Sequence, residues 1–423
     1  MMWCDARATR ATLAALALLA VVAAGVAAAG STPATRYFPQ PRVASVTLAA
    51  AGDVMFDRGV RSAIAAHGAD WPLSAVADVF RGADIGFVNL ETALTTAGER
   101  LPGKGIWFRS DPSFAGRLRD AGVNIVSLAN NHALDYGRDA FAAALDALEA
   151  AGVAASGGGR NAQEARRAAI IRRNGITVAF LSYSELAPVF WSWTNPQTFM
   201  AGASTPGIPG WNVEQILSDI RRTKSMCHHV IVSFHWGDEY SRMPAERQTA
   251  LGRAAIDAGA SVVLGHHPHV LQPVEVYRSG VIFYSLGNFV FDQKKVHTRD
   301  SLIARLVLTP YGVDAVQLVP AFIEDCRPKP LHGLEARAAL NRFVALCDES
   351  GGIGAQVVFA DNSGYLLLDG RGGGRDGVGA AAGATSDTLL ALLLMGSRTR
   401  YAASRRLPFP GQLLWAFGHF GPQ

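Results

Sequence analysis

Cysteine and concentrated charge are scarce in this 423-residue chain. Of the four cysteines, no two have the Cys-x-x-Cys spacing of a zinc or redox motif. Cys326 and Cys347 are near enough in sequence to pair in an oxidising compartment, and a pair of buried free thiols fits the sequence at least as well. The formal net charge is only +4, and Lys and Arg are scattered along the chain. This pattern disfavours a nucleic-acid partner.

Two common catalytic motifs are also missing. No Gly-x-Ser-x-Gly elbow is present, which disfavours a serine hydrolase. No Gly-x-Gly-x-x-Gly follows the first predicted strand, which disfavours dinucleotide binding. The chemistry must therefore be sought in other polar residues.

An apolar run lies near the start of the sequence. Residues 11–30 consist only of Ala, Leu, Val, Thr and Gly, and Arg7 and Arg10 precede them. A basic flank before such a run is typical of an export signal, and about 20 apolar residues can span a bilayer. Ala27 to Ala29 would permit cleavage, whereas the length of the run slightly favours a retained anchor. Either way the body is expected outside the cytoplasm, at the cell membrane if the segment is retained and secreted if it is cleaved. Cys4 precedes the run, which disfavours a lipoprotein.

The body of the chain reads as an α/β domain, because short β-branched or apolar runs alternate with Ala-rich helical stretches from Ala44 to about Pro310. The expected strands are Val46 to Ala51, Ile85 to Leu90, Asn124 to Leu128, Val178 to Ser182, His229 to Phe234, Ser261 to Leu264, Val270 to Tyr277, Val281 to Tyr284 and Leu302 to Leu308. The expected helices are Leu73 to Arg81, Phe114 to Ala121, Gly137 to Ala151, Val213 to Lys224 and Pro244 to Ala258. The late strands follow one another without helices, so mixed sheets are expected.

Three regions are expected along the chain. Residues 1–36 form the signal or anchor and a linker, residues 44–350 form the α/β domain, and residues 351–423 form a C-terminal extension. Near the domain's end, Cys326 to Pro330 and a helix over Glu335 to Leu346 are expected to close it. The extension contains a Gly-rich linker at Gly370 to Gly383 and a short apolar segment followed by Arg residues.

Polar residues with metal-binding chemistry stand just after several predicted strands, where open α/β sheets bind ligands. The strand ends deliver Asp53, then Asn89 and Glu91, then Asn131 and His132, then His235, and finally His266, His267 and His269. Each piece alone has an ordinary structural explanation as a turn, a helix cap or a buried histidine. Together they converge on one edge, which unrelated caps have no reason to do.

The donor set indicates the chemistry. Imidazole, carboxylate and amide oxygen without thiolate suit Mn, Fe, Zn or Mg better than a structural zinc site. Such a set supports metal-assisted hydrolysis, in which one or two divalent ions polarise a phosphoryl-like oxygen and an imidazole protonates the leaving group. His132 is the candidate acid.

The strings GDVM, NLE, ANNH, HWG, GHHPHVLQP and YSLGNFVFD, in this order, resemble the CapA family of capsule and poly-γ-glutamate synthesis proteins, over about Thr47 to Asp292. The family is similar to calcineurin-like metallophosphoesterases. The resemblance therefore implies a metallophosphoesterase-like sandwich of two mixed β-sheets flanked by helices, with metal ligands at one edge. It implies metal-binding roles for Asp53, Asn131, His235, His267 and His269, and a catalytic role for His132.

Two positions depart from the phosphoesterase pattern. Met55 stands where an Asp-x-His motif has its second ligand, and a thioether is a poor partner for a hard ion. Asn89 and Glu91 replace the motif that supplies a bridging Asp, so Glu91 is the expected bridge and Asn89 a substrate contact. Arg58 follows Asp53 in the same loop and is expected to contact an anionic substrate, although a plain surface Arg fits equally.

Three functions remain open at this point. The chain could be an exported, membrane-tethered component of capsule assembly that handles an anionic polymer such as poly-γ-glutamate or capsular polysaccharide. It could be a phosphoesterase with an unrelated substrate. It could also be a binding subunit of a membrane synthase complex without turnover of its own.

Overall fold

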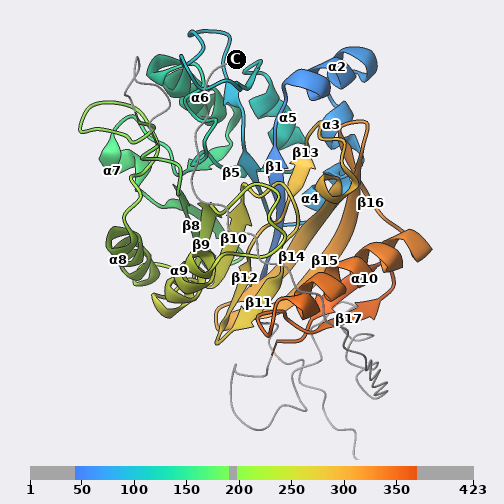
Figure 1. Cartoon of the computed structure of the whole chain (residues 1–423). Coiled ribbons are helices and arrows are strands. Elements are labelled where there is room, and N and C mark those ends of the chain that lie inside the picture. The colour runs from blue at the N-terminus through green and yellow to red at the C-terminus, as the bar shows by residue number, and fades with distance from the viewer. Residues whose placement is uncertain (1–42, 190–197, 369–423) are drawn as a thin grey trace, which may run out of the picture. The chain divides into compact units, whose positions relative to one another are not determined.

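The computed structural model describes residues 43–189 and 198–368. Contacts divide the chain after Val43, and the body described below belongs to the second unit, Ala44–Gln423. Figure 1 shows its layers, in which two β-sheets lie against each other and helices cover their outer faces. Both sheets contain parallel and antiparallel pairs, so the expected architecture of two mixed sheets flanked by helices is confirmed.

The larger sheet has ten strands, in the order β17-β18-β15-β14-β1-β2-β5-β6, with β13 paired to β1 and β16 to β15. Its strands are β1 (Val46–Val54), β2 (Ile85–Leu90), β5 (Ile125–Ser127), β6 (Ala154–Ser156), β13 (Asn288–Val290), β14 (Asp300–Thr309), β15 (Gly312–Glu324), β16 (Arg327–Pro330), β17 (Val357–Ala360) and β18 (Ser363–Leu366). Strand β1 lies in the middle, parallel to β2 and antiparallel to β14.

The smaller sheet has six strands in the order β11-β12-β10-β9-β8-β7. They are β7 (Ala169–Arg173), β8 (Ile176–Ser184), β9 (His229–His235), β10 (Val262–His266), β11 (Val274–Tyr277) and β12 (Gly280–Phe283). Strands β8, β9, β10 and β12 run parallel, while β7 and β11 are antiparallel edge strands. A short parallel pair, β3 (Ala93–Leu94) with β4 (Arg109–Ser110), stands apart.

The helices of the described region are α2 (Arg58–His67), α3 (Trp71–Ser74), α4 (Ala77–Arg81), α5 (Phe114–Asp120), α6 (Arg138–Ala151), α7 (Ala162–Ala165), α8 (Val213–Lys224), α9 (Glu246–Asp257) and α10 (Gly333–Glu349), with a 3-10 turn at Val296–Thr298. Side-chain caps fix several helix starts. The Asn212 side chain accepts a hydrogen bond from the Gln215 amide at the start of α8, which satisfies one of the free N–H groups of the first turn.

Strand β1 is buried on both faces because the sheet is covered on both sides. Leu48 and Ala50 belong to the core between the two sheets, where Phe87 of β2 stacks on Phe180 of β8 at 5.7 Å between ring centroids. The alternate residue Ala49 faces the other way, into the core beneath the helices. Burying such side chains contributes roughly 1.5–3 kcal/mol for each large one. The packing on both faces fixes the position of the strand ends.

Several elements differ from the sequence-based expectations. The expected helix over Leu73 to Arg81 is interrupted and forms α3 and α4, and β11 begins only at Val274. The segment near Pro328 is not a separate closing piece but strand β16, paired with β15. The large sheet continues past residue 350, since β17 and β18 add to β15. Cys326 and Cys347 are free thiols.

Within residues 43–189 and 198–368, no helix combines the length and the apolar character needed to cross a bilayer. The apolar run at residues 11–30, the Gly-rich stretch at residues 370–383 and the apolar segment at residues 389–395 lie outside the described residues.

Candidate metal centre

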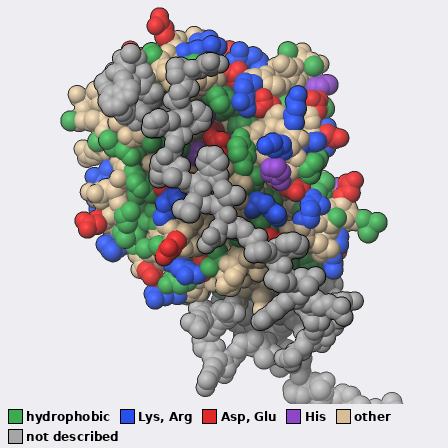
Figure 2. Space-filling model, in the orientation of Figure 1, with side chains coloured by type: hydrophobic (Ala, Val, Ile, Leu, Met, Phe, Trp, Pro, Cys, Tyr) green, Lys and Arg blue, Asp and Glu red, His purple; other side chains and the backbone are tan. Residues whose placement is uncertain are grey.

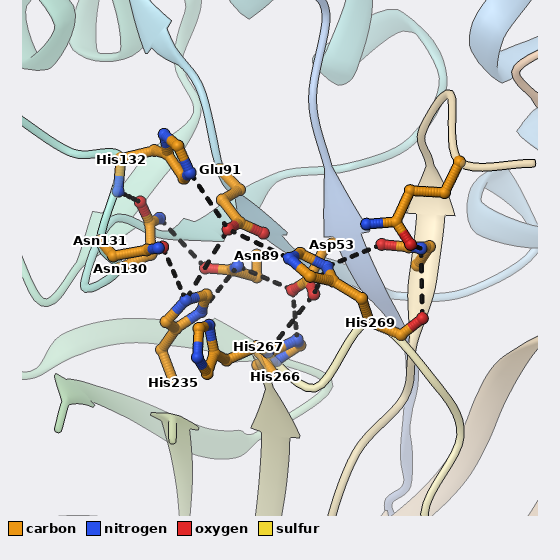
Figure 3. Close-up of polar contacts among 12 residues, drawn as sticks. Asp53, Asn89, Glu91, Asn130, Asn131, His132, His235, His266, His267 and His269 are labelled. Carbon is orange, nitrogen blue, oxygen red and sulfur yellow. Dashed lines mark hydrogen bonds and ion pairs between the residues drawn. The ribbon is translucent and has the colours of Figure 1, made fainter. Parts of the chain in front are cut away.

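The predicted metal-binding residues meet at one edge of the two sheets, although they come from five strands. Figure 3 shows them converging from the ends of β1, β2, β5, β9 and β10. Asp53 stands in β1, Glu91 directly after β2, His132 in the turn after β5, His235 at the end of β9, and His266 at the end of β10. The parallel arrangement carries their carboxyl ends to the same side.

A glycine brings Asp53 close to the second half of the site. The Asp53 amide donates to the Gly287 carbonyl at 3.0 Å, next to β13. A Cβ atom at Gly52 would lie 1.9 Å from that same carbonyl oxygen, so no side chain fits there. The Gly-Asp sequence thus permits a close approach of two backbones and places the Asp53 carboxylate at the edge.

Glu91 forms the middle of the centre. Its side chain is fully buried, and within residues 43–189 and 198–368 neither carboxylate oxygen has a hydrogen-bond partner. Three imidazole Nε2 atoms surround Glu91 Oε1, those of His132 at 4.0 Å, His235 at 3.8 Å and His269 at 3.9 Å. These separations are too long for hydrogen bonds and suit ligands that share a cation. Burial, followed by repulsion from Asp53, raises the pKa of Glu91 well above its usual value.

Asp53 is also fully buried but is well partnered. Asp53 Oδ1 accepts a hydrogen bond from the Asn89 amide at 2.8 Å, and Oδ2 lies 3.3 Å from His269 Nδ1. His266 Nδ1 lies 3.3 Å from Oδ1. Burial alone would raise the pKa of Asp53, but the contacts with the His266 and His269 imidazoles lower it well below the usual value. Asp53 is therefore held as a carboxylate, and His266, left aside in the sequence analysis, is its direct neighbour.

His235 is placed by two amides. Its Nε2 lies 3.0 Å from Asn131 Oδ1, and its Nδ1 lies 3.3 Å from the Asn89 amide nitrogen. The side chain of Asn89 is fully buried and contacts both Asp53 and His235. Asn89 thus lies beneath the other polar groups and orients two of them, a different position from the substrate contact that the sequence suggested. Burial lowers the pKa of His235 well below the usual value, so the imidazole is neutral and able to bind a cation.

The turn after β10 has an unusual backbone. His267 and His269 have φ angles of 96° and 58°, in a region that side chains rarely adopt. His269 Nδ1 also lies 2.9 Å from Asn288 Oδ1, which leaves Nε2 directed towards Glu91. Such a contact from outside the ligand shell commonly orients a metal-binding histidine. Asn288 belongs to the Gly-Asn-Phe string of the chain, but its role was not predicted.

His132 forms a pair with a residue that the sequence analysis missed. Its Nδ1 lies 2.6 Å from Asp135 Oδ2, which also accepts the Phe108 amide at 2.6 Å. The buried amine of Lys104 pairs with the other Asp135 oxygen. Phe108 stacks on the imidazole at 3.9 Å between ring centroids. Lys104 Nζ also lies 3.0 Å from His132 Nδ1. Because Asp135 Oδ2 accepts the Phe108 amide, we assign the proton of its 2.6 Å contact with the imidazole to His132 Nδ1, and Nε2 then faces the centre without one. The His-x-x-Asp spacing is the signal that could have revealed this pair.

Burial shifts the pKa of both His132 and Asp135. It lowers the pKa of His132 well below its usual value, with further lowering from the nearby Lys104 charge. It raises the pKa of Asp135 to about 7, although Lys104 acts against this shift. A neutral imidazole with an acceptor behind it can take up a proton at Nε2 and release it again.

Arg58 and Met55 lie at the margin of the centre. The Arg58 guanidinium lies over the Phe108 ring, 4.7 Å from its centroid, and pairs with Asp292. Its side chain is 39% exposed, so it can still reach a molecule at the mouth of the site. The sulfur of Met55 instead accepts the Asp57 amide at 2.9 Å, and the side chain packs in the apolar core.

The residues present fit a divalent cation. Asp53, Glu91 and His235 each offer one ligand atom, and these atoms lie within 4.8 Å of one another. The buried carboxylates of Asp53 and Glu91 repel each other. A cation bound between them would remove this repulsion and would be coordinated by the Glu91 oxygens, which accept no hydrogen bond from the described residues. The donor set of carboxylate, imidazole and the Asn131 amide oxygen is that of Mn, Fe, Zn or Mg.

Comparison with known proteins agrees with the motifs. The family described as Bacterial capsule synthesis protein PGA_cap matches residues 47–293. The chain is 32% identical over 297 residues to the capsule biosynthesis protein CapA of Bacillus anthracis, which covers 68% of this chain and 69% of that protein. It is 34% identical over 282 residues to the PGA biosynthesis protein CapA of Bacillus subtilis, which covers 66% and 72%.

Among solved structures, the calcineurin-like phosphoesterase YfkN of Bacillus subtilis is 14% identical, with a TM-score of 0.37 over 69% of this chain and 89% of that chain. The family match includes all of the strands that carry the centre, from β1 to β13. The chain therefore belongs to the bacterial capsule synthesis protein family PGA_cap, whose relatives include the CapA proteins of two Bacillus species.

Proposed function

We propose that this protein is a metal-dependent hydrolase of capsule assembly that acts on an anionic polymer such as poly-γ-glutamate or capsular polysaccharide. The names of the two CapA relatives support the capsule and poly-γ-glutamate context. The observation that carries the catalytic part is Glu91, a fully buried carboxylate that has no hydrogen-bond partner among the described residues and has three imidazole nitrogens 3.8–4.0 Å from its Oε1.

In this proposal Asp53, Glu91, Asn131, His235, His267 and His269 hold one or two divalent cations. When bound, such a cation supplies Lewis-acid polarisation of an anionic substrate oxygen. Asn89 orients Asp53 and His235 through its amide. The carboxylates and imidazoles of the centre are buried away from bulk water, and this strengthens the electrostatic interactions among them.

His132 carries the proton in the reaction. Its Nδ1 is held by Asp135, so Nε2 keeps a fixed direction towards the centre. At that atom it can take a proton from an attacking water and deliver it to the leaving group. This oriented pair favours turnover over a function in binding alone, because a binding subunit has no need of a positioned proton carrier.

Arg58 is the proposed contact for the polymer. Its guanidinium is partly exposed beside Phe108, and a planar guanidinium matches the geometry of carboxylate or phosphate. On the face shown in Figure 2, Lys and Arg are interspersed with Asp and Glu. Attraction of a polyanion would therefore come from the cations and Arg58 at the site instead of from a broad basic field.

The proposed location is the extracytoplasmic side of the cell membrane, supported by the apolar run at residues 11–30 behind Arg7 and Arg10. Contact with membrane synthase subunits is part of the same proposal. Extraction of membranes at alkaline pH tests the tether, since a retained segment keeps the full chain in the pellet and a cleaved one releases it.

The test of function is complementation. In a strain that lacks this gene and has lost surface polymer, the wild-type chain should restore the polymer, and the His132→Ala variant, expressed at equal level, should not. Restoration by His132→Ala would refute the catalytic proposal. The purified full chain should in parallel hydrolyse poly-γ-glutamate or a phosphodiester model substrate only with a divalent cation, and phosphodiester hydrolysis without restored polymer would favour a phosphoesterase with another substrate.

A further inference from the structure

A second group of potential ligands lies beside the first. Glu239, His267 and His269 each offer one ligand atom, and these atoms lie within 4.8 Å of one another. Around a single ion at about 2.0–2.2 Å, ligand atoms are separated by up to about 4.4 Å. Small side-chain rotations would therefore close the group. We propose that Glu239 is a ligand of a second divalent cation, shared with His267 and His269; the inference rests on the proposed metal-dependent function.

The surroundings of the His267 imidazole indicate that it binds a cation. Its side chain is only 5% exposed, and its Nδ1 has no hydrogen-bond partner in the part of the chain that the structure describes. A buried polar atom without a hydrogen-bond partner is destabilising, and so is a positive φ angle at a residue other than glycine. The turn bears both costs, because His267 and His269 both have positive φ angles. A cation bound to His267 would explain why this strained turn is kept.

Two backbone hydrogen bonds connect the loop that carries Glu239 to the turn that contains His267 and His269. The Trp236 amide donates to the His266 carbonyl at 3.1 Å, and the Tyr240 amide donates to the Pro268 carbonyl at 2.8 Å. These two hydrogen bonds stand on either side of Glu239 and fix the loop beside His267 and His269. Glu239 itself is exposed, so its carboxylate faces the open side of the centre. The remaining positions around a cation there would be open to water or substrate.

Glu91 lies between the two groups of potential ligands. Met55 belongs to neither group, because its sulfur is directed to the Asp57 amide. The Glu91 Oε1 atom lies 3.8 Å from His235 Nε2 and 3.9 Å from His269 Nε2, so Glu91 would be available to either cation.

The test is the number of ions bound by the full chain. Metal-free protein is titrated with Mn²⁺ alone, and bound metal is counted by calorimetry and by elemental analysis. The variant is Glu239→Gln, which keeps the shape and removes the charge. The matched control is Asp238→Asn in the same loop, because Asp238 is exposed and pairs with Arg247 at 2.9 Å instead of with a histidine.

We expect two ions in the wild-type chain and in Asp238→Asn. In Glu239→Gln one of the two positions should weaken by about 100-fold or more, since even residues behind the ligands change affinity by about 10–100-fold. Two ions held by Glu239→Gln within about twofold of wild-type affinity would overturn the inference, and so would a wild-type chain that binds only one. A chain that binds two ions and hydrolyses nothing would refute the proposed function and leave this inference standing. An unchanged thermal melt in chelator shows that Glu239→Gln is folded.

Discussion

Replacement of Glu91 by Gln should make the folded protein more stable than wild type in the absence of metal and less stable than wild type when metal is bound. In chelator, wild type contains a fully buried carboxylate that accepts no hydrogen bond from the described residues and has Asp53 close by. Because burial and repulsion from Asp53 raise the pKa of Glu91, folding at neutral pH must either protonate this carboxyl or bury its charge, at a cost on the order of 1–3 kcal/mol that a Gln amide does not have. Glu91→Gln keeps the shape and removes the charge. We therefore expect the free energy of unfolding in chelator to rise by about 1–3 kcal/mol.

With Mn²⁺ the order should invert. A cation that binds the folded state alone adds about 4 kcal/mol at a concentration 1,000 times Kd. Wild type should gain this amount, and Glu91→Gln should gain little, because a neutral amide replaces the central carboxylate. Urea unfolding of the full chain, followed by tryptophan fluorescence with chelator and with Mn²⁺, measures both effects. A variant that is less stable than wild type in chelator, and that gains as much from Mn²⁺, would refute the metal-binding account of Glu91.

Three other changes give separate tests. Asp135→Asn removes the carboxylate 2.6 Å from His132 Nδ1, so turnover of a phosphodiester model substrate should fall by about 10²–10⁴-fold. Elemental analysis should show that the metal content is unchanged. A loss of metal would indicate that Asp135 has a structural role instead. Burial lowers the pKa of His229 from 6.5 to about 4, so the unfolded chain takes up a proton that the folded protein resists. Stability is then complete above about pH 6.5 and should fall by about 3 kcal/mol towards pH 4; urea unfolding should show a flatter pH dependence for His229→Gln, and an equally steep one would contradict the assignment. Gly52→Ala would place a Cβ 1.9 Å from the Gly287 carbonyl oxygen, so the free energy of unfolding should fall by about 1–3 kcal/mol or more. A decrease below about 0.5 kcal/mol would show that the two backbone segments can move apart.

Two elements were predictable from sequence to the residue. Strand β2 and helix α8 have the predicted bounds, because apolar runs or helical periodicity end sharply there. Strand β15 was missed, since Pro320 stands inside it and proline is rare within strands. Strand β13 has only three residues, too few for a periodic pattern.

The candidate site was predictable in its members but less so in their contacts. Neighbouring strands of one parallel sheet end at the same edge, so Asp53 and Glu91 could be grouped without coordinates. His235 ends a strand of the second sheet, and the strand pattern alone did not predict how the two sheets align. Asp135 could have been found from its spacing to His132. Glu239 could not, because it stands in a loop whose path depends on hydrogen bonds to the turn after β10.

The most direct test is a crystal structure of the full chain soaked in Mn²⁺, with diffraction recorded at the manganese edge. The account predicts an anomalous peak within about 2.3 Å of Glu91 Oε1 and of His235 Nε2, with the Asp53 carboxylate in the same coordination shell. Ordered side chains at these positions without an anomalous peak among them, at saturating Mn²⁺, would contradict the claim that this edge binds metal.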